Sequence, residues 1–108
     1  MPRVKRSVVE HNAFILLEYL VSRSSPEPRF AIVSYRTMTN DLGMSQNRVR
    51  NLVRLLVKRG YIEVHHRFAE DGGELSNAHL ITKQGVAALR AYGERLRQES
   101  HRERVEEL

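Results

Sequence analysis

A single glycine, Gly43, separates two segments that each have the pattern of a short helix. Serine is a preferred helix N-cap, and Ser34 and Ser45 stand where helices over residues 35–41 and 46–59 would begin. Glycine adopts the left-handed backbone needed just past a helix end, so a tight turn is predicted at this glycine. Two helices separated by so few residues must lie close together, and this pair constrains the rest of the fold.

The second of these segments combines an apolar stripe with an unusual charge pattern. Its apolar residues follow the spacing i, i+3, i+4 and i+7 of one buried helix face: Val49, Leu52, Val53 and Leu56. It has no acidic residue, although solvated faces usually mix both signs, and its positive residues are Arg48, Arg50, Arg54, Lys58 and Arg59. The last two also suit the negative end of the helix dipole, just before Gly60. An ordinary amphipathic helix that is arginine-rich by chance is the less favoured interpretation.

A further helix is predicted before this pair. Ser7-Val8-Val9-Glu10 has the form of a capping box, so the helix is expected to begin there. It should end near Arg23, because prolines follow at positions 26 and 28. Its predicted apolar line runs through Val8, His11 or Asn12, Ile15, Tyr19 and Ser22, with Leu16 and Leu20 beside it.

The remaining segments predict strands and a last helix. Phe30-Ala31-Ile32-Val33 is short, apolar and partly β-branched, which suits one small strand. Residues 61–68 and 75–81 predict a hairpin around the turn Asp71-Gly72-Gly73, and Thr82 can cap a helix from Lys83 onward. The predicted order is helix, strand, helix, turn, helix, hairpin and helix, which makes the fold mainly α with a small β-hairpin.

Composition excludes several classes of protein. The chain has no cysteine, so it can form neither a disulfide framework nor a thiolate metal site. His65 and His66 are adjacent on a predicted strand and point to opposite faces, so no metal site is expected. Because no nucleophile motif or phosphate loop is present, we expect neither enzymatic activity nor a cofactor. Without a signal peptide or an apolar segment of membrane-spanning length, a soluble, cytoplasmic protein is expected.

Positive charge is concentrated in the first part of the chain. Residues 1–68 carry a net charge of +7 and residues 69–108 a net charge of −2. Such a field attracts polyanions, of which nucleic acid is the commonest for a soluble protein. Arginine can bond guanine in a bidentate way, and asparagine or glutamine can do the same with adenine. Base edges are therefore the expected ligands of the outward residues of the acid-free helix: Gln46, Asn47, Arg50, Asn51 and Arg54, with Arg48 at the flank.

Three stretches resemble the winged helix-turn-helix signature of MarR-type and GntR-type bacterial regulators and of related plasmid and phage replication proteins. They are Ser34-Tyr35-Arg36-Thr37-Met38, Leu42-Gly43-Met44-Ser45-Gln46-Asn47-Arg48-Val49-Arg50 and Leu56-Val57-Lys58-Arg59-Gly60-Tyr61-Ile62. Leu80-Ile81-Thr82-Lys83-Gln84-Gly85-Val86 is similar to the strand-to-helix junction of MarR-type and PadR-type proteins. The resemblance covers about residues 7–96. It implies a winged helix-turn-helix domain over residues 1–82, with residues 83–108 as a C-terminal helix and possible dimerisation element.

By position, the resemblance assigns a role to each residue of the DNA-binding set. Bases face Gln46, Asn47, Arg50 and Asn51, while Arg48 and Arg54 contact bases or phosphate. Backbone phosphates lie at the start of the preceding helix, at Ser34, Tyr35, Arg36 and Thr37, and Ser45 completes the set. Core packing of Tyr35 and a solvated Arg36 are alternatives. The wing tip of many relatives is basic, whereas Glu70-Asp71-Gly72-Gly73-Glu74 is acidic, which leaves Arg67 as the better wing contact.

The last helix has an apolar stripe that either packs on its own domain or forms a dimer seam: Val86, Leu89, Tyr92 and Leu96. We expect a homodimer that binds double-stranded DNA sequence-specifically and regulates transcription, as a repressor that acts by occupancy. A plasmid or phage replication-initiation or partition module is one alternative. A protein-interaction winged helix, favoured by the acidic wing tip, is the other. A small-molecule effector is possible, but no pattern in the sequence supports one.

Overall fold

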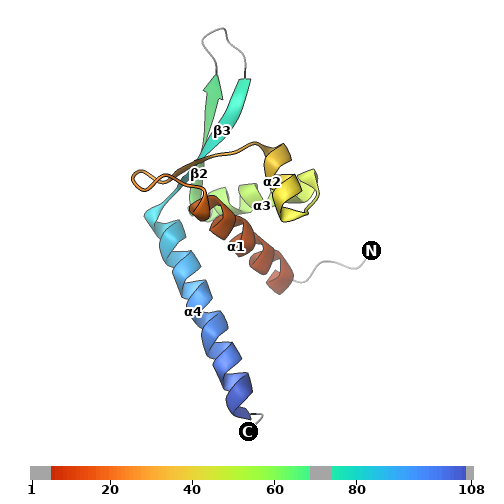
Figure 1. Cartoon of the computed structure of the whole chain (residues 1–108), viewed down its shortest axis with the longest axis vertical. Helices are drawn as coiled ribbons and strands as arrows, with labels where there is room; N and C mark the ends of the chain where they lie inside the picture. The colour runs from red at the N-terminus through yellow and green to blue at the C-terminus, as the bar shows by residue number, and fades with distance from the viewer. Residues whose placement is uncertain (1–5, 69–73, 107–108) are drawn as a thin grey trace.

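The computed structural model describes residues 6–68 and 74–106, and its elements follow the predicted order (Figure 1). They are α1 (Arg6–Ser22), β1 (Phe30–Ile32), α2 (Tyr35–Leu42), α3 (Gln46–Lys58), β2 (Ile62–Phe68), β3 (Glu74–Ile81) and α4 (Lys83–Glu106). The helices α1, α2 and α3 cluster at the base of the β2–β3 hairpin, and α4 runs away from it in the opposite direction. The predicted fold, mainly α with a small antiparallel hairpin in winged helix-turn-helix order, is confirmed.

The helix-turn-helix unit is built from local capping contacts, as predicted. The hydroxyl of Ser34 accepts a hydrogen bond from the Thr37 amide at 3.1 Å, which fixes the start of α2. Gly43 ends that helix in the left-handed region, with φ of 64°. The hydroxyl of Ser45 then accepts from the Arg48 amide at 3.1 Å and begins α3. Two caps and one glycine therefore set the angle between α2 and α3.

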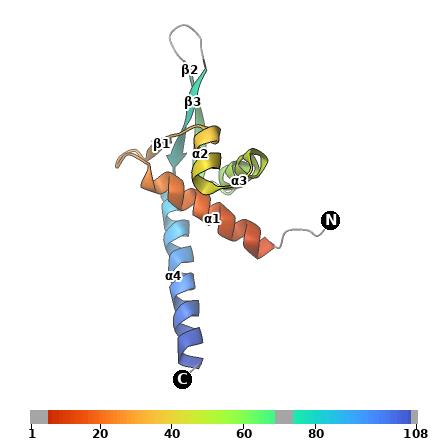
Figure 2. The same cartoon turned by 45° about the vertical axis from the view of Figure 1, so that its right-hand side comes forward.

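The sheet has three strands rather than the two of a simple hairpin. Its order is β1-β3-β2, and both neighbours of β3 are antiparallel to it. At the centre of the pairing His79 lies opposite both Ala31 of β1 and Val64 of β2. The sequence predicted the strand at residues 30–33 but not its partner. As a result, the base of the hairpin is attached to the segment that precedes α2, while its far end projects from the domain as the wing (Figure 2).

The face that α1 buries differs from the predicted one. Its buried residues are Ala13, Phe14, Leu16, Leu17 and Leu20, and they contact the inner face of α3. Val8 and Ile15, placed on the predicted apolar line, are 44% and 37% exposed. The larger apolar group around Leu16 turns the helix so that this line faces outward. The capping-box prediction is also wrong, because α1 begins at Arg6 and Ser7 lies inside its first turn.

The start of α4 is fixed by contacts around Thr82, as the predicted cap requires. The Thr82 hydroxyl donates to the Gly60 carbonyl oxygen at 2.7 Å and accepts from the Gly85 amide at 3.0 Å. The Thr82 amide donates to the Tyr61 carbonyl oxygen at 3.0 Å. Gly85 is buried against Tyr61, with no room for a side chain. These contacts fasten the start of α4 to the residues that end α3.

Lowering the pH from 7 to 5 is expected to destabilise the fold through His79. This ring is fully buried, with Nδ1 3.4 Å from the Ala31 carbonyl oxygen, and burial lowers its pKa below the ordinary value of about 6.5. The unfolded chain therefore gains a proton near pH 6.5 that the folded chain accepts only at lower pH. The free energy of unfolding should fall as the pH decreases through this window.

Thermal unfolding of the native chain and of His79→Gln at pH 7 and pH 5 checks this expectation. Between pH 7 and pH 5, the melting temperature of the native chain should fall further than that of the variant. An identical loss in both would show that other groups cause the pH dependence.

Candidate nucleic-acid interface

The outer face of α3 presents the predicted base readers together. Val49, Leu52, Val53 and Leu56 are at most 4% exposed, so the helix is anchored firmly by its inner side. The residues of the opposite side are all exposed: Gln46, Asn47, Arg48, Arg50, Asn51 and Arg54. Figure 2 shows α3 at the side of the molecule, with the wing above it and α1 below it. An exposed, polar helix of this diameter fits the major groove of duplex DNA.

The electrostatics of this face are positive and uncompensated among the described residues. No described carboxylate lies within 4.0 Å of the guanidinium groups of Arg48, Arg50 or Arg54. Arg59 differs from them, because its Nη1 lies 4.0 Å from Glu10 Oε1 on α1. It is the C-cap of α3 and therefore has a structural role. Three arginines without an ion-pair partner among the described residues are suited to an anionic partner.

The acidic residue of α2 is directed away from this face. Asp41 accepts hydrogen bonds from the Tyr19 hydroxyl at 2.6 Å and from Arg23 Nη2 at 2.7 Å. Burial, and then the hydrogen bond to Asp41, raise the pKa of Tyr19 to about 12. The carboxylate is thus neutralised on α1 and does not offset the charge of α3.

The start of α2 lies beside α3, and its predicted phosphate contacts differ in their surroundings. The Ser34 hydroxyl donates to Thr37 Oγ1 at 2.9 Å, so these two side chains are already bonded to each other. Arg36 is exposed and free to turn toward solvent. Tyr35 is half-buried, and its ring contacts both the imidazole of His79 and the guanidinium of Arg50. This placement favours packing for Tyr35, the alternative left open by the sequence.

The wing contributes one described candidate. Arg67 lies on β2, half-buried, and its Nη1 donates to the Ser76 carbonyl oxygen of β3 at 3.3 Å. The acidic turn predicted at residues 70–74 falls largely outside the described residues. Among the described residues of the wing, Arg67 is the one that the sequence indicated as a DNA contact.

A groove beside the first turn of α3 brings in residues that the sequence did not indicate. It has a volume of about 290 Å³, and α1 contributes Val9 and Asn12 to its wall. The other lining residues belong to α3 and its cap: Ser45, Asn47, Arg48, Asn51 and Leu52. Asn12 had been placed on the predicted apolar line of α1. The amide side chain of Asn12 on that otherwise largely apolar line was the signal in the sequence that this edge of α1 joins the α3 face.

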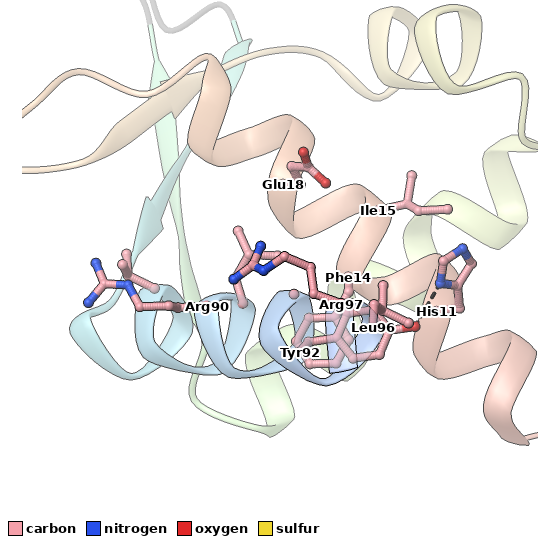
Figure 3. A pocket seen from close by; sticks show the side chains of 11 residues that line it. His11, Phe14, Ile15, Glu18, Arg90, Tyr92, Leu96 and Arg97 are labelled. Carbon is pink, nitrogen blue, oxygen red and sulfur yellow. Dashed lines mark hydrogen bonds between the residues drawn. The ribbon is translucent and has the colours of Figure 1, made fainter. Parts of the chain in front are cut away.

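The apolar stripe of α4 is divided between the chain's own core and solvent. Val86, Leu89 and Tyr92 are half-buried and pack against the core, whereas Leu96 is 40% exposed. The Tyr92 ring stacks on Phe14 of α1 at a centroid distance of 4.2 Å, and its hydroxyl lies 2.7 Å from His11 Nδ1. A groove of about 400 Å³ separates α1 from α4 along this stripe (Figure 3). Both predicted roles of the stripe, packing and association, therefore have residues that suit them.

The described residues contain neither a cluster of metal ligands nor a membrane-spanning helix. Within residues 6–68 and 74–106, no three histidine, cysteine, aspartate or glutamate side chains converge in a way that could hold a metal ion. Over the same ranges, none of the helices has the length and apolar character needed to cross a lipid bilayer.

Comparison with known proteins gives one family match. Residues 10–62 match the family model described as a helix-turn-helix domain, and this range contains most of α1 and all of β1, α2 and α3. No curated protein is significantly similar to the chain. The matched range begins within α1 and ends just beyond the cap of α3 at Arg59. The match, the capped α2–α3 pair with its glycine turn and the hairpin that follows identify residues 10–62 as a helix-turn-helix domain within a winged helix-turn-helix fold.

Proposed function

We propose that this protein binds double-stranded DNA in a sequence-specific way and regulates transcription. The observation that carries the proposal is the outer face of α3, where exposed arginines and amides have no acidic neighbour among the described residues. Arginine discriminates guanine and asparagine or glutamine discriminates adenine in the major groove. One helix face with both kinds of side chain can therefore specify a mixed sequence.

Each part of the interface has a proposed role. The first two turns of α3 enter the major groove, where Gln46, Asn47, Arg50 and Asn51 address base edges. Backbone phosphates are contacted by Arg48, Arg54 and Arg67, by Arg36 and Thr37 of α2, and by the two cap serines, Ser34 and Ser45. The amides of the first turn of α2 add donors for phosphate oxygens. Phosphate contacts set the register, and the α3 residues set the sequence.

Repression by occupancy is the regulatory mode we propose. The helix-turn-helix match and the hairpin account for the chain up to Thr82, and a single helix, α4, follows. A DNA-bound domain of this kind acts by covering its site.

We also propose that the protein binds as a homodimer through α1 and α4. Ile15 and Leu96 are exposed apolar residues that line the same groove. Glu18 of α1 and Arg90 and Arg97 of α4 line it too, so one face carries both signs of charge (Figure 3). A surface with both signs can pair with its own copy across a two-fold axis. The α4 helix has 24 residues, roughly 36 Å in length, which allows a long seam with the partner.

Selection of bound duplexes from a random pool tests the proposed function. The expected result is enrichment of a defined sequence motif, with an affinity for it that exceeds the affinity for unselected DNA by about 10³-fold or more. The affinity should also fall steeply as the salt concentration rises, because phosphate contacts release counterions. Enrichment of no motif, with equal binding to every duplex and to other polyanions, would exclude sequence-specific recognition.

The same selection reports on the dimer. Two α3 helices related by a two-fold axis should select an inverted repeat whose half-sites lie about one helical turn, roughly 34 Å, apart. A motif without internal symmetry, bound by one protein chain per duplex, would contradict the proposed dimer and leave DNA recognition by α3 intact.

A further inference from the structure

Tyr35 forms a bridge between the core and the base-reading face. It is the first residue of α2, so the Ser34 cap fixes the backbone from which its ring extends. The ring meets the imidazole of His79 edge-on, with centroids 6.3 Å apart and an interplanar angle of 87°. The guanidinium carbon of Arg50 lies over the same ring, 5.4 Å from its centroid. Three side chains from β3, α2 and α3 therefore form one series of contacts, with His79 as its inner member and Arg50 as its outer member.

His79, the inner member of this series of contacts, is held rigidly by the fold. His79 is fully buried in the middle strand of the sheet, and Nδ1 faces the Ala31 carbonyl oxygen at 3.4 Å. Its Nε2 is buried and has no hydrogen-bond partner among the described residues, consistent with a neutral ring packed as part of the core. A close-packed core leaves such a ring little freedom to move. His79 is therefore a fixed contact for the Tyr35 ring.

The outer member is held by the tyrosine ring. Arg50 is exposed, and no described carboxylate lies within 4.0 Å of it. The face of an aromatic ring attracts a guanidinium and also matches its planar shape. Arg54, one turn further along the same exposed face, has no described aromatic ring within cation–π range. The two arginines thus share an exposed face without a described carboxylate within 4.0 Å, and only Arg50 has an aromatic ring beside it.

We propose that Tyr35 is a positioning residue, which holds Arg50 in the orientation needed to read a base and thereby sets discrimination at that base pair. This inference rests on the proposed function for its effect on DNA. Its geometric part concerns the free protein alone. An arginine that is oriented before binding loses less side-chain freedom on contact with its base. The phenol ring is the part of Tyr35 that matters in this role, and the hydroxyl is dispensable.

The free protein provides the first test. ¹⁵N relaxation of the arginine Nε–H groups should show Arg50 more ordered than Arg54. Tyr35→Leu should reduce the order of Arg50 to that of Arg54, and Tyr35→Phe should leave it unchanged. Equal order of the two arginines in the native chain would overturn the proposal, whatever the protein does with DNA. Tyr35→Met, which retains apolar volume without a π-face, replaces Tyr35→Leu if that variant unfolds.

Binding to the selected duplex and to single-base-pair variants of it provides the second test. Tyr35→Leu should lower affinity by roughly two- to fivefold, the effect of one exposed cation–π contact, and only where the base pair read by Arg50 is intact. In an Arg50→Ala background the same substitution should have no further effect. Tyr35→Phe should bind as the native chain does.

Two results would overturn the bridge in this second test. Loss of affinity in Tyr35→Phe on every duplex would identify the hydroxyl as a phosphate contact instead. An undiminished loss from Tyr35→Leu in the Arg50→Ala background would show that Tyr35 acts independently of Arg50. A native chain without any sequence preference would refute the proposed function, while the order of Arg50 would still decide whether the bridge exists.

Discussion

Replacing Arg50 and Asn51 together with alanine should reduce affinity for the selected duplex between about 30-fold and 10⁴-fold. Each bidentate contact between a side chain and a base contributes about 1–3 kcal/mol of discrimination, and in the proposed interface the two residues address different base types. Both side chains are exposed on α3, so their removal leaves the buried stripe of that helix untouched. Binding titrations with the selected duplex and with a scrambled one measure the effect. Affinity for the scrambled duplex should change far less.

Lys58→Ala is the matched control for this variant. Lys58 is also an exposed cation of α3, but it lies at the end of the helix, away from the first two turns. Its loss should weaken binding to both duplexes by a similar, small factor and reduce the salt dependence. If the double variant behaves in the same way as Lys58→Ala, the α3 face supplies only charge and the reading of bases lies elsewhere.

Gly85→Ala should destabilise the protein by about 2–3 kcal/mol, because the new methyl group has no space. A Cβ at this position would overlap with the carbonyl oxygen of Tyr61 and lie 3.1 Å from its Cα. Both are backbone atoms that cannot move aside by a change of rotamer. To make room, α4 would have to move away from Tyr61, which would lengthen or break the hydrogen bonds of the Thr82 hydroxyl. A fall in melting temperature of roughly 10 °C is expected.

Gly93→Ala provides the opposite expectation within the same helix. A Cβ at Gly93 would meet only the Arg97 Nη1 at 3.7 Å, which is an ordinary contact. Alanine is the better helix former, so this variant should gain about 0.5–1 kcal/mol. Thermal unfolding of both variants separates the two effects. An unchanged or higher melting temperature for Gly85→Ala would mean that the junction of α4 with Tyr61 is not closely packed in solution.

The helix-turn-helix unit was predictable because its determinants are local. The caps at Ser34 and Ser45, the left-handed glycine between them and the apolar stripe of α3 each depend on residues within one or two helical turns. Because that stripe faces inward, the exposed set from Gln46 to Arg54 follows directly from the helical period. The same holds for Thr82, whose capping position is fixed by the residues around it.

Long-range contacts account for what the sequence did not predict. The pairing of β1 with β3 joins segments almost fifty residues apart, and no local pattern specifies which strand a three-residue segment will join. The buried face of α1 depends on what α3 and α4 present to it, so the line through Val8 and Ile15 was wrong. The environment of Tyr35 could not be predicted from the sequence either, because His79 and Arg50 contact it from two other elements. Whether the dimer stripe of α4 associates with a partner stays a prediction.

The contacts around Thr82 attach the start of α4 to the end of α3. In addition to the threonine contacts, Gln84 Nε2 donates to the carbonyl oxygen of Arg59, the residue that caps α3, at 3.1 Å. These hydrogen bonds join the start of α4 directly to the C-cap of α3 and the two residues after it. In the proposed dimer, the angle at which two α4 helices cross would determine the distance between the two α3 helices. A change at the far end of α4 could thus alter the permitted spacing of half-sites without touching a single residue of the DNA-binding face.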